Sequence, residues 1–183
     1  MSVFPILETE RLRLRDLRIS DAETIQTLLN EPEITGNLMD KALPYSLEDA
    51  QSLITYSQDA FAQGKAYMFA IERKSNEDMI GYCDVEVQAD HQRGEIAYWI
   101  GLPYWWQGYA TEAAKRVVRF GFEDLALNRI YAYVMKRNEA SAHVLQKAGL
   151  IYEGTQRHGT RKNDVYEDVD FYGLLREDWL TAR

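Results

Sequence analysis

The chain has 183 residues, of which 46% are hydrophobic, and a formal net charge of −8 at pH 7. This length supports one substantial core, so we expect a single domain over residues 1–183. The acidic excess repels phosphate backbones and argues against nucleic acid as the main partner. The apolar runs are too short for a spanning helix and the N-terminus lacks the pattern of a signal peptide. We therefore expect a cytoplasmic protein with no membrane segment.

Residue alternation and helix caps outline the first part of the chain. Arginine alternates with leucine over residues 11–15, which is the period of a half-buried strand that shows one face to water. Ser20 with Glu23, and Ser46 with Asp49, both match the capping box that opens a helix. They predict two helices, one over residues 21–29 and one from residue 47 to a stop at Gly64.

The middle of the chain alternates apolar and polar residues in three stretches joined by short turns. These stretches predict an antiparallel meander of strands over residues 67–73, 79–87 and 95–102. Cys83, the single cysteine, lies in the second stretch, and we expect a buried thiol there. The remainder predicts, in order, a helix from Thr111, a strand over 129–135, a helix capped by Asn138, and strands around 150–157 and 165–175.

The segment between the third of these strands and the next helix has the features of an anion site. Gly108 stands just before the helix, where free backbone N–H groups meet the positive end of the helix dipole. A diphosphate bound there would accept several N–H hydrogen bonds, because Gly108 lets it approach the backbone closely and the side chain of Ala110 is too small to block it. An ordinary strand-to-helix turn is the alternative. The lysine of a P-loop and the three glycines of a Rossmann turn are absent from the sequence.

Three short motifs then resemble a known family. GYATEA at 108–113, NEAS at 138–141 and KAGL at 147–150 are similar to the GNAT acetyltransferases. With ETERLRLR near one end and YEDVDFYGLL near the other, the chain more narrowly resembles the ribosomal-protein N-terminal acetyltransferase branch over nearly its whole length. The resemblance implies an α/β GNAT fold with flanking helices. Its mixed, mostly antiparallel sheet would be splayed between the fourth and fifth strands, here EIAYWIG and RIYAYVM.

The resemblance further implies that acetyl-CoA lies in the splay and is held mainly by backbone groups. The glycine and alanine of the family's diphosphate loop are present, but Trp105 stands where Gln or Arg is usual. The residues assigned in this way to the cofactor are Ile100, Leu102, Trp106, Gln107, Gly108, Tyr109, Ala110, Thr111 and Asn138. Ile100 and Leu102 would pair with the pantetheine amides as a neighbouring strand does. Asn138 serves equally well as a helix cap.

Acetyl transfer requires a neutral amine to attack a thioester and a proton to reach the departing thiolate, so no covalent enzyme intermediate is needed. The resemblance implies Ser141 as the acid, because Leu145 stands where many superfamily members carry a tyrosine. A surface role is the alternative for Ser141. Glu95 shares a strand face with Ala97 and Trp99 and is the candidate base, acting through water. The alternative for Glu95 is a rim carboxylate paired with an arginine.

The acceptor is the least determined part of the sequence. The resemblance implies that residues 30–45 and 156–166 flank the acetyl group on opposite sides. They offer carboxylates and two aromatic rings to a cationic chain, namely Glu31, Glu33, Asp40, Asp164 and Glu167 with Tyr45 and Tyr166. His158 is expected to be a solvated loop histidine, and Thr160 stands where the branch often has a glutamate. His91 and His143 have no partners at metal-binding spacing, so no metal is expected.

The sequence therefore predicts an acetyl-CoA-dependent N-acetyltransferase whose acceptor is the α-amine of a protein N-terminus. Such an amine has a lower pKa than lysine and offers more neutral nucleophile near pH 7. Three alternatives stay open: a small-molecule amine such as a polyamine or an antibiotic as acceptor, a non-catalytic acyl-CoA-binding GNAT domain, and an adaptor whose aromatic surface binds a partner. A homodimer is also left open.

Overall fold

The computed structural model describes residues 3–182, and within them eight strands form one sheet in the order β1-β2-β3-β4-β5-β6-β8-β7. The strands are β1 (Leu7–Glu8), β2 (Leu12–Asp16), β3 (Ala66–Arg73), β4 (Met79–Gln88), β5 (Arg93–Ile100), β6 (Arg129–Met135), β7 (Ile151–Lys162) and β8 (Val165–Leu175). The α-helices are α1 (Ala22–Leu29), α2 (Pro32–Thr35), α3 (Leu47–Ala62), α4 (Tyr109–Glu123), α5 (Glu139–Lys147) and α6 (Arg176–Thr181).

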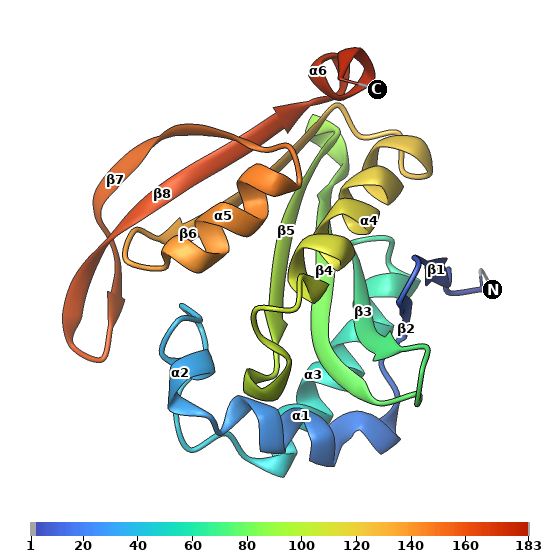
Figure 1. Ribbon diagram of the computed structural model, residues 1–183, viewed down its shortest axis with the longest axis vertical. Helices are drawn as coiled ribbons and strands as arrows, with labels where there is room; N and C mark the ends of the chain where they lie inside the picture. The colour runs from blue at the N-terminus through green and yellow to red at the C-terminus, as the bar shows by residue number, and fades with distance from the viewer. Residues whose placement is uncertain (1–2, 183) are drawn as a thin grey trace.

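Helices cover both faces of the sheet (Figure 1). On one face, α4 and α5 bury apolar residues such as Val117 and Leu145 in the larger of two core clusters. On the other face, Ile25 of α1 and Ile54 of α3 pack in the second cluster together with Trp99 of β5. The strands β3, β4 and β5 contribute residues to both clusters and are therefore covered on both sides, and this burial fixes the position of β5 between the two layers.

The sheet splays between β5 and β6, which are its parallel pair. Their pairing covers only Arg93–Glu95 against Arg129–Tyr131, whereas β6 pairs with β8 from Arg129 to Met135. Beyond Glu95 the two strands diverge, as Figure 1 shows. The predicted mixed sheet with a splay between the fourth and fifth expected strands is confirmed. The divergence leaves one side of β5 without a strand partner, so its backbone groups there are open to another molecule.

One expected helix cap is confirmed and the other is wrong. Ser46 Oγ accepts the N–H of Asp49 at 3.0 Å, and the Asp49 carboxylate accepts the N–H of Ser46 at 2.8 Å, so α3 begins with a full capping box. The box expected at Ser20 and Glu23 does not form. Instead a 3-10 turn precedes α1, whose N-cap is Asp21 and has no side-chain cap hydrogen bond. The Asp21 carboxylate is used in a buried ion pair.

That ion pair also overturns, for Arg15, the expectation that the arginines of this strand face water, whereas the side chain of Arg13 is 40% exposed as expected. Arg15 is 6% exposed, and its Nη1 and Nη2 donate to Asp21 at 2.8 and 2.9 Å. Its Nε donates to Glu72 on β3 at 2.7 Å. Because the buried charges meet through several hydrogen bonds, the cluster joins β2, β3 and the start of α1 in one arrangement.

We expect an Asp21→Ala substitution to lower the free energy of unfolding by about 3–5 kcal/mol, because it leaves part of the buried Arg15 charge uncompensated. Urea denaturation measures this change. Asp16→Ala is the matched control, since Asp16 pairs with exposed Arg18 at 3.4 Å and such pairs contribute about 0–1 kcal/mol. Equal, small losses for both variants would contradict the assigned role of the cluster.

Candidate active site

A cavity of about 710 Å³ opens where β5 and β6 diverge. Its wall comes from β4, β5, β6, the first turns of α4 and α5, and the loop after α2. The structure brings together most of the residues predicted from the sequence, since the cavity is lined by Glu95, Ile100, Trp106, Gly108, Tyr109, Ala110, Thr111, Asn138 and Ser141. The side chains of Leu102 and Gln107 lie outside this lining.

The loop before α4 has the geometry that an anion requires. Gly108 is the N-cap of α4, with a φ of +82° and no side-chain cap, so the N–H groups of the first turn have no acceptor within the helix. Trp106 also has a left-handed φ, +64°, and is 87% exposed at the mouth of the cavity. Gln107, whose φ is negative, stands between these two left-handed residues, and such an alternation of hand turns successive backbone N–H groups toward one side, as in anion-binding nests. A diphosphate therefore fits the chemistry of this loop.

The carbonyl oxygens of Ile100 and Leu102, beside this loop, each accept a hydrogen bond from within the protein. The indole Nε1 of Trp105 donates to the carbonyl oxygen of Ile100 at 2.6 Å, and the N–H of Trp105 donates to that of Leu102 at 3.2 Å. Each carbonyl oxygen has a second lone pair, so each can still accept an amide of a pantetheine arm. Pairing of Ile100 and Leu102 with that arm stays a prediction.

A hydroxyl pair lies at the start of α5. The hydroxyl of Tyr98 lies 2.8 Å from Ser141 Oγ and 2.9 Å from the Ser141 carbonyl oxygen. Asn138 Oδ1 accepts the N–H of Ser141 at 3.1 Å, which confirms the predicted cap and leaves Asn138 Nδ2 for a ligand. Burial raises the pKa of Tyr98 well above its usual value. Tyr98 has one hydrogen, which it donates to the Ser141 carbonyl oxygen, so Ser141 Oγ donates to the Tyr98 oxygen and has to rotate to donate into the cavity.

Glu95 lies at the point where the splay begins. Burial raises the pKa of Glu95 and the charge of Glu86 adds to this, while the hydroxyls of Tyr133 and Tyr131 oppose the rise. No ion pair between Glu95 and an arginine occurs among residues 3–182, so the alternative of an arginine-paired rim carboxylate finds no support. The carboxyl group faces the cavity in a form that binds a proton more readily than a solvated glutamate.

Asp84 on β4 is a second carboxyl group in the cavity, and the sequence did not single it out. It is 4% exposed, accepts the hydroxyl of Tyr82 at 2.5 Å, and accepts the N–H of Ala97 at 2.8 Å. Burial raises the pKa of Asp84 to about 7, although these two hydrogen bonds lower it. In sequence, Asp84 and Glu86 look like the wet face of a strand. The register of the meander, which puts Glu86 opposite Glu95, is the signal that could have found them.

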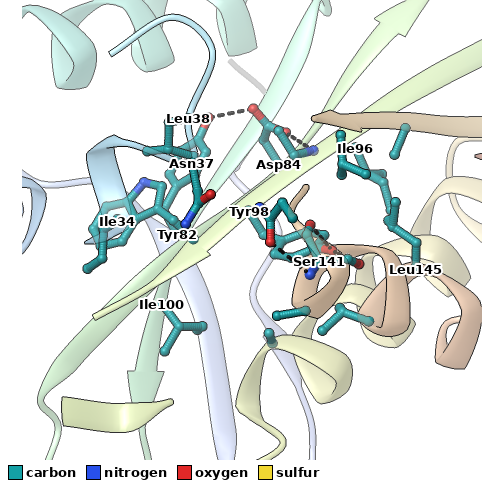
Figure 2. Close-up of a pocket in the computed structure, with 18 of the residues that line it drawn as sticks. Ile34, Asn37, Leu38, Tyr82, Asp84, Ile96, Tyr98, Ile100, Ser141 and Leu145 are labelled. Atoms are coloured by element: carbon teal, nitrogen blue, oxygen red, sulfur yellow. Dashed lines mark hydrogen bonds between the residues drawn. The ribbon is translucent and has the colours of Figure 1, made fainter. Parts of the chain in front are cut away.

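Two distinct groups of polar side chains thus face the cavity. Figure 2 shows Asp84 on the side where Asn37 and Leu38 lie, and Tyr98 with Ser141 on the other side. Carboxyl groups on one side can attract a cation and accept a proton, and hydroxyl groups on the other can donate one. The arrangement suits a reaction in which the attacking nucleophile loses a proton and the leaving group gains one.

The two segments expected to flank the acetyl group on opposite sides meet each other. Lys162 at the end of β7 is 7% exposed, and its Nζ donates to the carbonyl oxygen of Leu38 at 2.5 Å and to that of Lys41. Arg137 Nη2 donates to the carbonyl oxygen of Gly36 at 2.6 Å. These contacts fix the loop after α2 against the β7–β8 hairpin, which reaches toward α2 in Figure 1. The loop closes one side of the cavity.

The two aromatic residues assigned to the acceptor groove lie outside the cavity lining. Tyr45 is 6% exposed and belongs to the core cluster under α1 and α3, so its expected stacking on an acceptor is wrong. Tyr166 is exposed on β8 and stacks on His158 at a centroid distance of 5.4 Å. The aromatic surfaces that do line the cavity on this side are those of Tyr56, Tyr82 and Trp99.

Cys83 is confirmed as a buried thiol. It is fully buried on β4, and burial raises the pKa of its thiol well above the usual value. A protonated, inaccessible thiol cannot accept an acetyl group. Within residues 3–182, His, Cys, Asp and Glu form no cluster of three or more that could hold a metal ion. None of the helices in the same residues is long and apolar enough to cross a membrane.

Comparison with known proteins assigns the family. A family model described as Acetyltransferase (GNAT) domain matches residues 11–151. The chain is 34% identical over 175 residues to the N-acetyltransferase YoaA of Bacillus subtilis, itself uncharacterized, covering 95% of this chain and 98% of that protein. The fold matches the ribosomal-protein-S5-alanine acetyltransferase of Vibrio fischeri with a TM-score of 0.84 at 22% identity, over 96% of this chain and 98% of that one.

The chain belongs to the GNAT acetyltransferases. It is an N-acetyltransferase, and acetyl-CoA is its acyl donor. Relatives that match about half of it carry different acceptors in their names. One is the putative ribosomal N-acetyltransferase YdaF of Bacillus subtilis, 33% identical over 49% of each chain. Another is the spermidine N(1)-acetyltransferase of Escherichia coli, 36% identical over 52% of each chain.

Proposed function

We propose that this protein transfers the acetyl group of acetyl-CoA directly to the α-amine of a protein N-terminus. The observation that carries direct transfer is one cavity at the splay, with carboxyl groups on one side, a hydroxyl pair on the other, and an open helix N-terminus at its mouth. The proposed acceptor rests on the resemblance to the ribosomal-protein branch over nearly the whole chain, and on the ribosomal relative named above.

In this proposal the chain holds its donor mainly through the backbone. The N–H groups of residues 108–111 bind the diphosphate at the positive end of the α4 dipole. The free side of β5 near Ile100, with Leu102 beyond it, binds the pantetheine arm, and Asn138 Nδ2 donates to the same arm. Bound in this way, acetyl-CoA supplies the activated acyl group.

The proton of the attacking amine passes to the carboxyl side of the cavity. Glu95 is the candidate from the sequence, and Asp84 joins it because its pKa of about 7 matches a base that works near neutral pH. The charges of Glu86 and Glu95 both raise the pKa of Asp84, Glu86 more strongly, so the protonation of Asp84 depends on its acidic neighbours. On the opposite side, the Ser141 hydroxyl rotates to donate a proton to the departing thiolate and takes one back from solvent water, and the Tyr98 oxygen lies 2.8 Å from Ser141 Oγ.

We expect Ser141→Ala to lower kcat by about 10²-fold, since a general acid acts in the transition state. The affinity for acetyl-CoA should stay within about two-fold. The cap of α5 survives because it uses the Ser141 N–H. Steady-state kinetics and calorimetry measure the two quantities. Tyr98→Phe, which removes only the supporting hydroxyl, should have a smaller effect on kcat. Wild-type turnover in the Ser141 variant would exclude Ser141 as the acid.

A competition between amines tests the acceptor. The acceptors are a lysine-free peptide with a free α-amine, the same peptide with a blocked α-amine and one added lysine, and spermidine. We expect the first to have the highest kcat/KM and the second to be inert, because the α-amine has the lower pKa. Faster transfer to spermidine or to the lysine would overturn the proposed acceptor and leave the acetyltransferase activity intact.

A polyamine is the second candidate acceptor, and one observation favours it. Asp84, Glu86 and Glu95 all line the cavity, and several carboxyl groups suit a chain with several positive charges. The spermidine acetyltransferase named above is similar over half of the chain. A higher kcat/KM for spermidine than for the peptide would decide for it. Coenzyme A binding without thiol release from any amine would instead indicate a non-catalytic binding domain.

A further inference from the structure

Arg11 lies on the outer side of the loop that leads into α4. Its Nη1 donates to the carbonyl oxygen of Gln107 at 2.9 Å, and its guanidinium lies over the ring of Tyr109 with 4.5 Å to the ring centroid. Gly108 and Tyr109 line the cavity, whereas Arg11 stands outside that lining. Arg11 therefore contacts the loop from outside the cavity lining.

The guanidinium of Arg11 is itself held in place by the first turn of α4. Its Nε donates to Glu112 at 2.7 Å, and the backbone N–H of Arg11 donates to the same carboxylate at 2.9 Å. The hydroxyl of Thr9 donates to Glu112 as well, at 2.6 Å. One carboxylate thus fixes both the chain before β2 and the guanidinium, and the guanidinium reaches from there to Gln107.

The hydrogen bond to Gln107 determines how the next peptide group is oriented. The bond between Gln107 and Gly108 is trans, and in a planar trans peptide the C=O and N–H groups point in opposite directions. With the Gln107 oxygen held on the outer side by Arg11, the N–H of Gly108 is directed to the inner side, where the cavity lies.

The backbone does not favour this orientation by itself. Gln107 stands between two residues with left-handed φ, +64° at Trp106 and +82° at Gly108. Such a φ is strained for a bulky side chain, and a strained loop persists only when surrounding contacts over-determine it. Among residues 3–182, the hydrogen bond from Arg11 is the one recorded for the Gln107 carbonyl oxygen.

We propose that Arg11 is a positioning residue for the diphosphate: it holds the Gln107 carbonyl oxygen outward, so that the Gly108 N–H faces the ligand before the ligand arrives. Arg11 acts through the loop and makes no contact with the donor. This inference rests on the proposed binding of the diphosphate at residues 108–111. The proposed role accounts for the hydrogen bonds from Thr9 and Arg11 to Glu112 of α4, a helix that starts about a hundred residues later in the chain.

Inhibition by coenzyme A and by pantetheine, which lacks the diphosphate, tests the proposal. Both compete with acetyl-CoA, and the inhibition constants are measured for the wild type and for Arg11→Met, which keeps an unbranched side chain and removes the guanidinium. We expect the constant for coenzyme A to rise at least about ten-fold and that for pantetheine to stay within about two-fold. Arg119→Met is the matched control, since Arg119 pairs with Glu123 at the other end of α4 and should leave both constants unchanged.

Two further variants separate positioning from charge and from folding. Arg11→Lys keeps the charge, but a single ammonium cannot span Glu112 and Gln107 as the guanidinium fork does. We expect it to lose most of the coenzyme A affinity. Glu112→Gln, which loosens the guanidinium without removing it, should give a smaller loss that is again confined to coenzyme A.

Three results would overturn the proposal: equal weakening of both ligands by Arg11→Met, no weakening of either, or full recovery of coenzyme A affinity in Arg11→Lys. A wild-type protein that binds coenzyme A no tighter than pantetheine would overturn the diphosphate site itself, and the proposal with it. The comparison of coenzyme A with pantetheine on the wild type shows this result before any variant is made. Acetyl transfer can still be measured in that case, so failure of the Arg11 proposal is distinguishable from failure of the proposed acetyltransferase activity.

Discussion

An Asp84→Asn variant should lose turnover by about 10²–10⁴-fold, the range expected for a missing general base. Asparagine has the same shape and can still accept the Ala97 N–H and contact the Tyr82 hydroxyl, so the cavity keeps its form. For the wild type, kcat/KM should rise with pH through about 7, the pKa of Asp84, as this carboxyl loses its proton. The variant should lack this limb. A pH profile from 5.5 to 9 measures both.

The same substitution should make the protein more stable at alkaline pH. The pKa of Asp84 is about 7 in the folded chain against about 3.9 in an unfolded one. Because the folded state binds this proton more tightly, the stabilising contribution is present at acid pH and is lost as pH rises through 7. The loss amounts to about 4 kcal/mol at most, and asparagine does not undergo it.

Urea unfolding at pH 5 and pH 9 measures the stability difference between Asp84→Asn and the wild type. We expect it to favour the variant more at pH 9. Asp90→Asn, at an exposed carboxylate in the turn after β4, is the control and should show no such change. A stability difference independent of pH, together with an unaltered acidic limb, would contradict the assigned role of Asp84.

Glu95→Gln complements this result. It should lower the rate and move the acidic limb to lower pH, because removing a neighbouring negative charge lowers the pKa of Asp84. An unchanged rate and profile would exclude Glu95 from the proton path. Comparison of the two variants then assigns the base to Asp84 or to Glu95.

A Gly108→Asp variant should bind acetyl-CoA about 100-fold more weakly, a loss of about 3 kcal/mol. The Cβ at this position stands 3.5 Å from Arg11 Nη2, so the new carboxylate would compete with the Gln107 carbonyl oxygen for the guanidinium and disturb the loop that holds the diphosphate. The carboxylate would also repel the phosphates. The fold should survive, since aspartate tolerates a left-handed φ and a Cβ at this position meets only Arg11, at 3.5 Å.

Gly108→Asn is the matched control for the charge. It has the same size and the same tolerance of left-handed φ, so it should weaken binding less than Gly108→Asp. Calorimetry with acetyl-CoA measures both affinities, and thermal unfolding checks the fold. An unchanged affinity in a folded Gly108→Asp protein would remove the basis for a diphosphate site at this loop.

Local patterns in the sequence predicted the elements that depend on local chemistry. Ser46 and Asp49 opened α3 as expected, Asn138 capped α5, and the meander formed over nearly the expected residues. The splay of the sheet followed from the resemblance and not from the pattern of strands. A pairing that ends after Glu95 depends on how β6 packs on β8, and neither strand encodes this alone.

The features that the sequence did not give depend on contacts between distant residues. Arg15 looked solvated because its partners, Asp21 and Glu72, come together only in the fold. Asp84 looked like the wet face of a strand until the register brought it against Ala97 in a covered cavity. Tyr98 carries no signal of its own in the sequence, and its partner Ser141 lies beside it only because α5 packs there. The roles of such polar residues depend on partners from other helices and strands, so they cannot be predicted from one element at a time.

A single-turnover experiment tests direct transfer most directly. Enzyme in excess is mixed with acetyl-CoA and the lysine-free peptide, and intact-mass spectrometry follows the protein, the peptide and the coenzyme over time. Direct transfer predicts that acetylated peptide and free coenzyme A appear at equal rates while the mass of the protein never changes. An acetylated protein that forms before the acetylated peptide, or peptide that stays unmodified while coenzyme A binds, would contradict it.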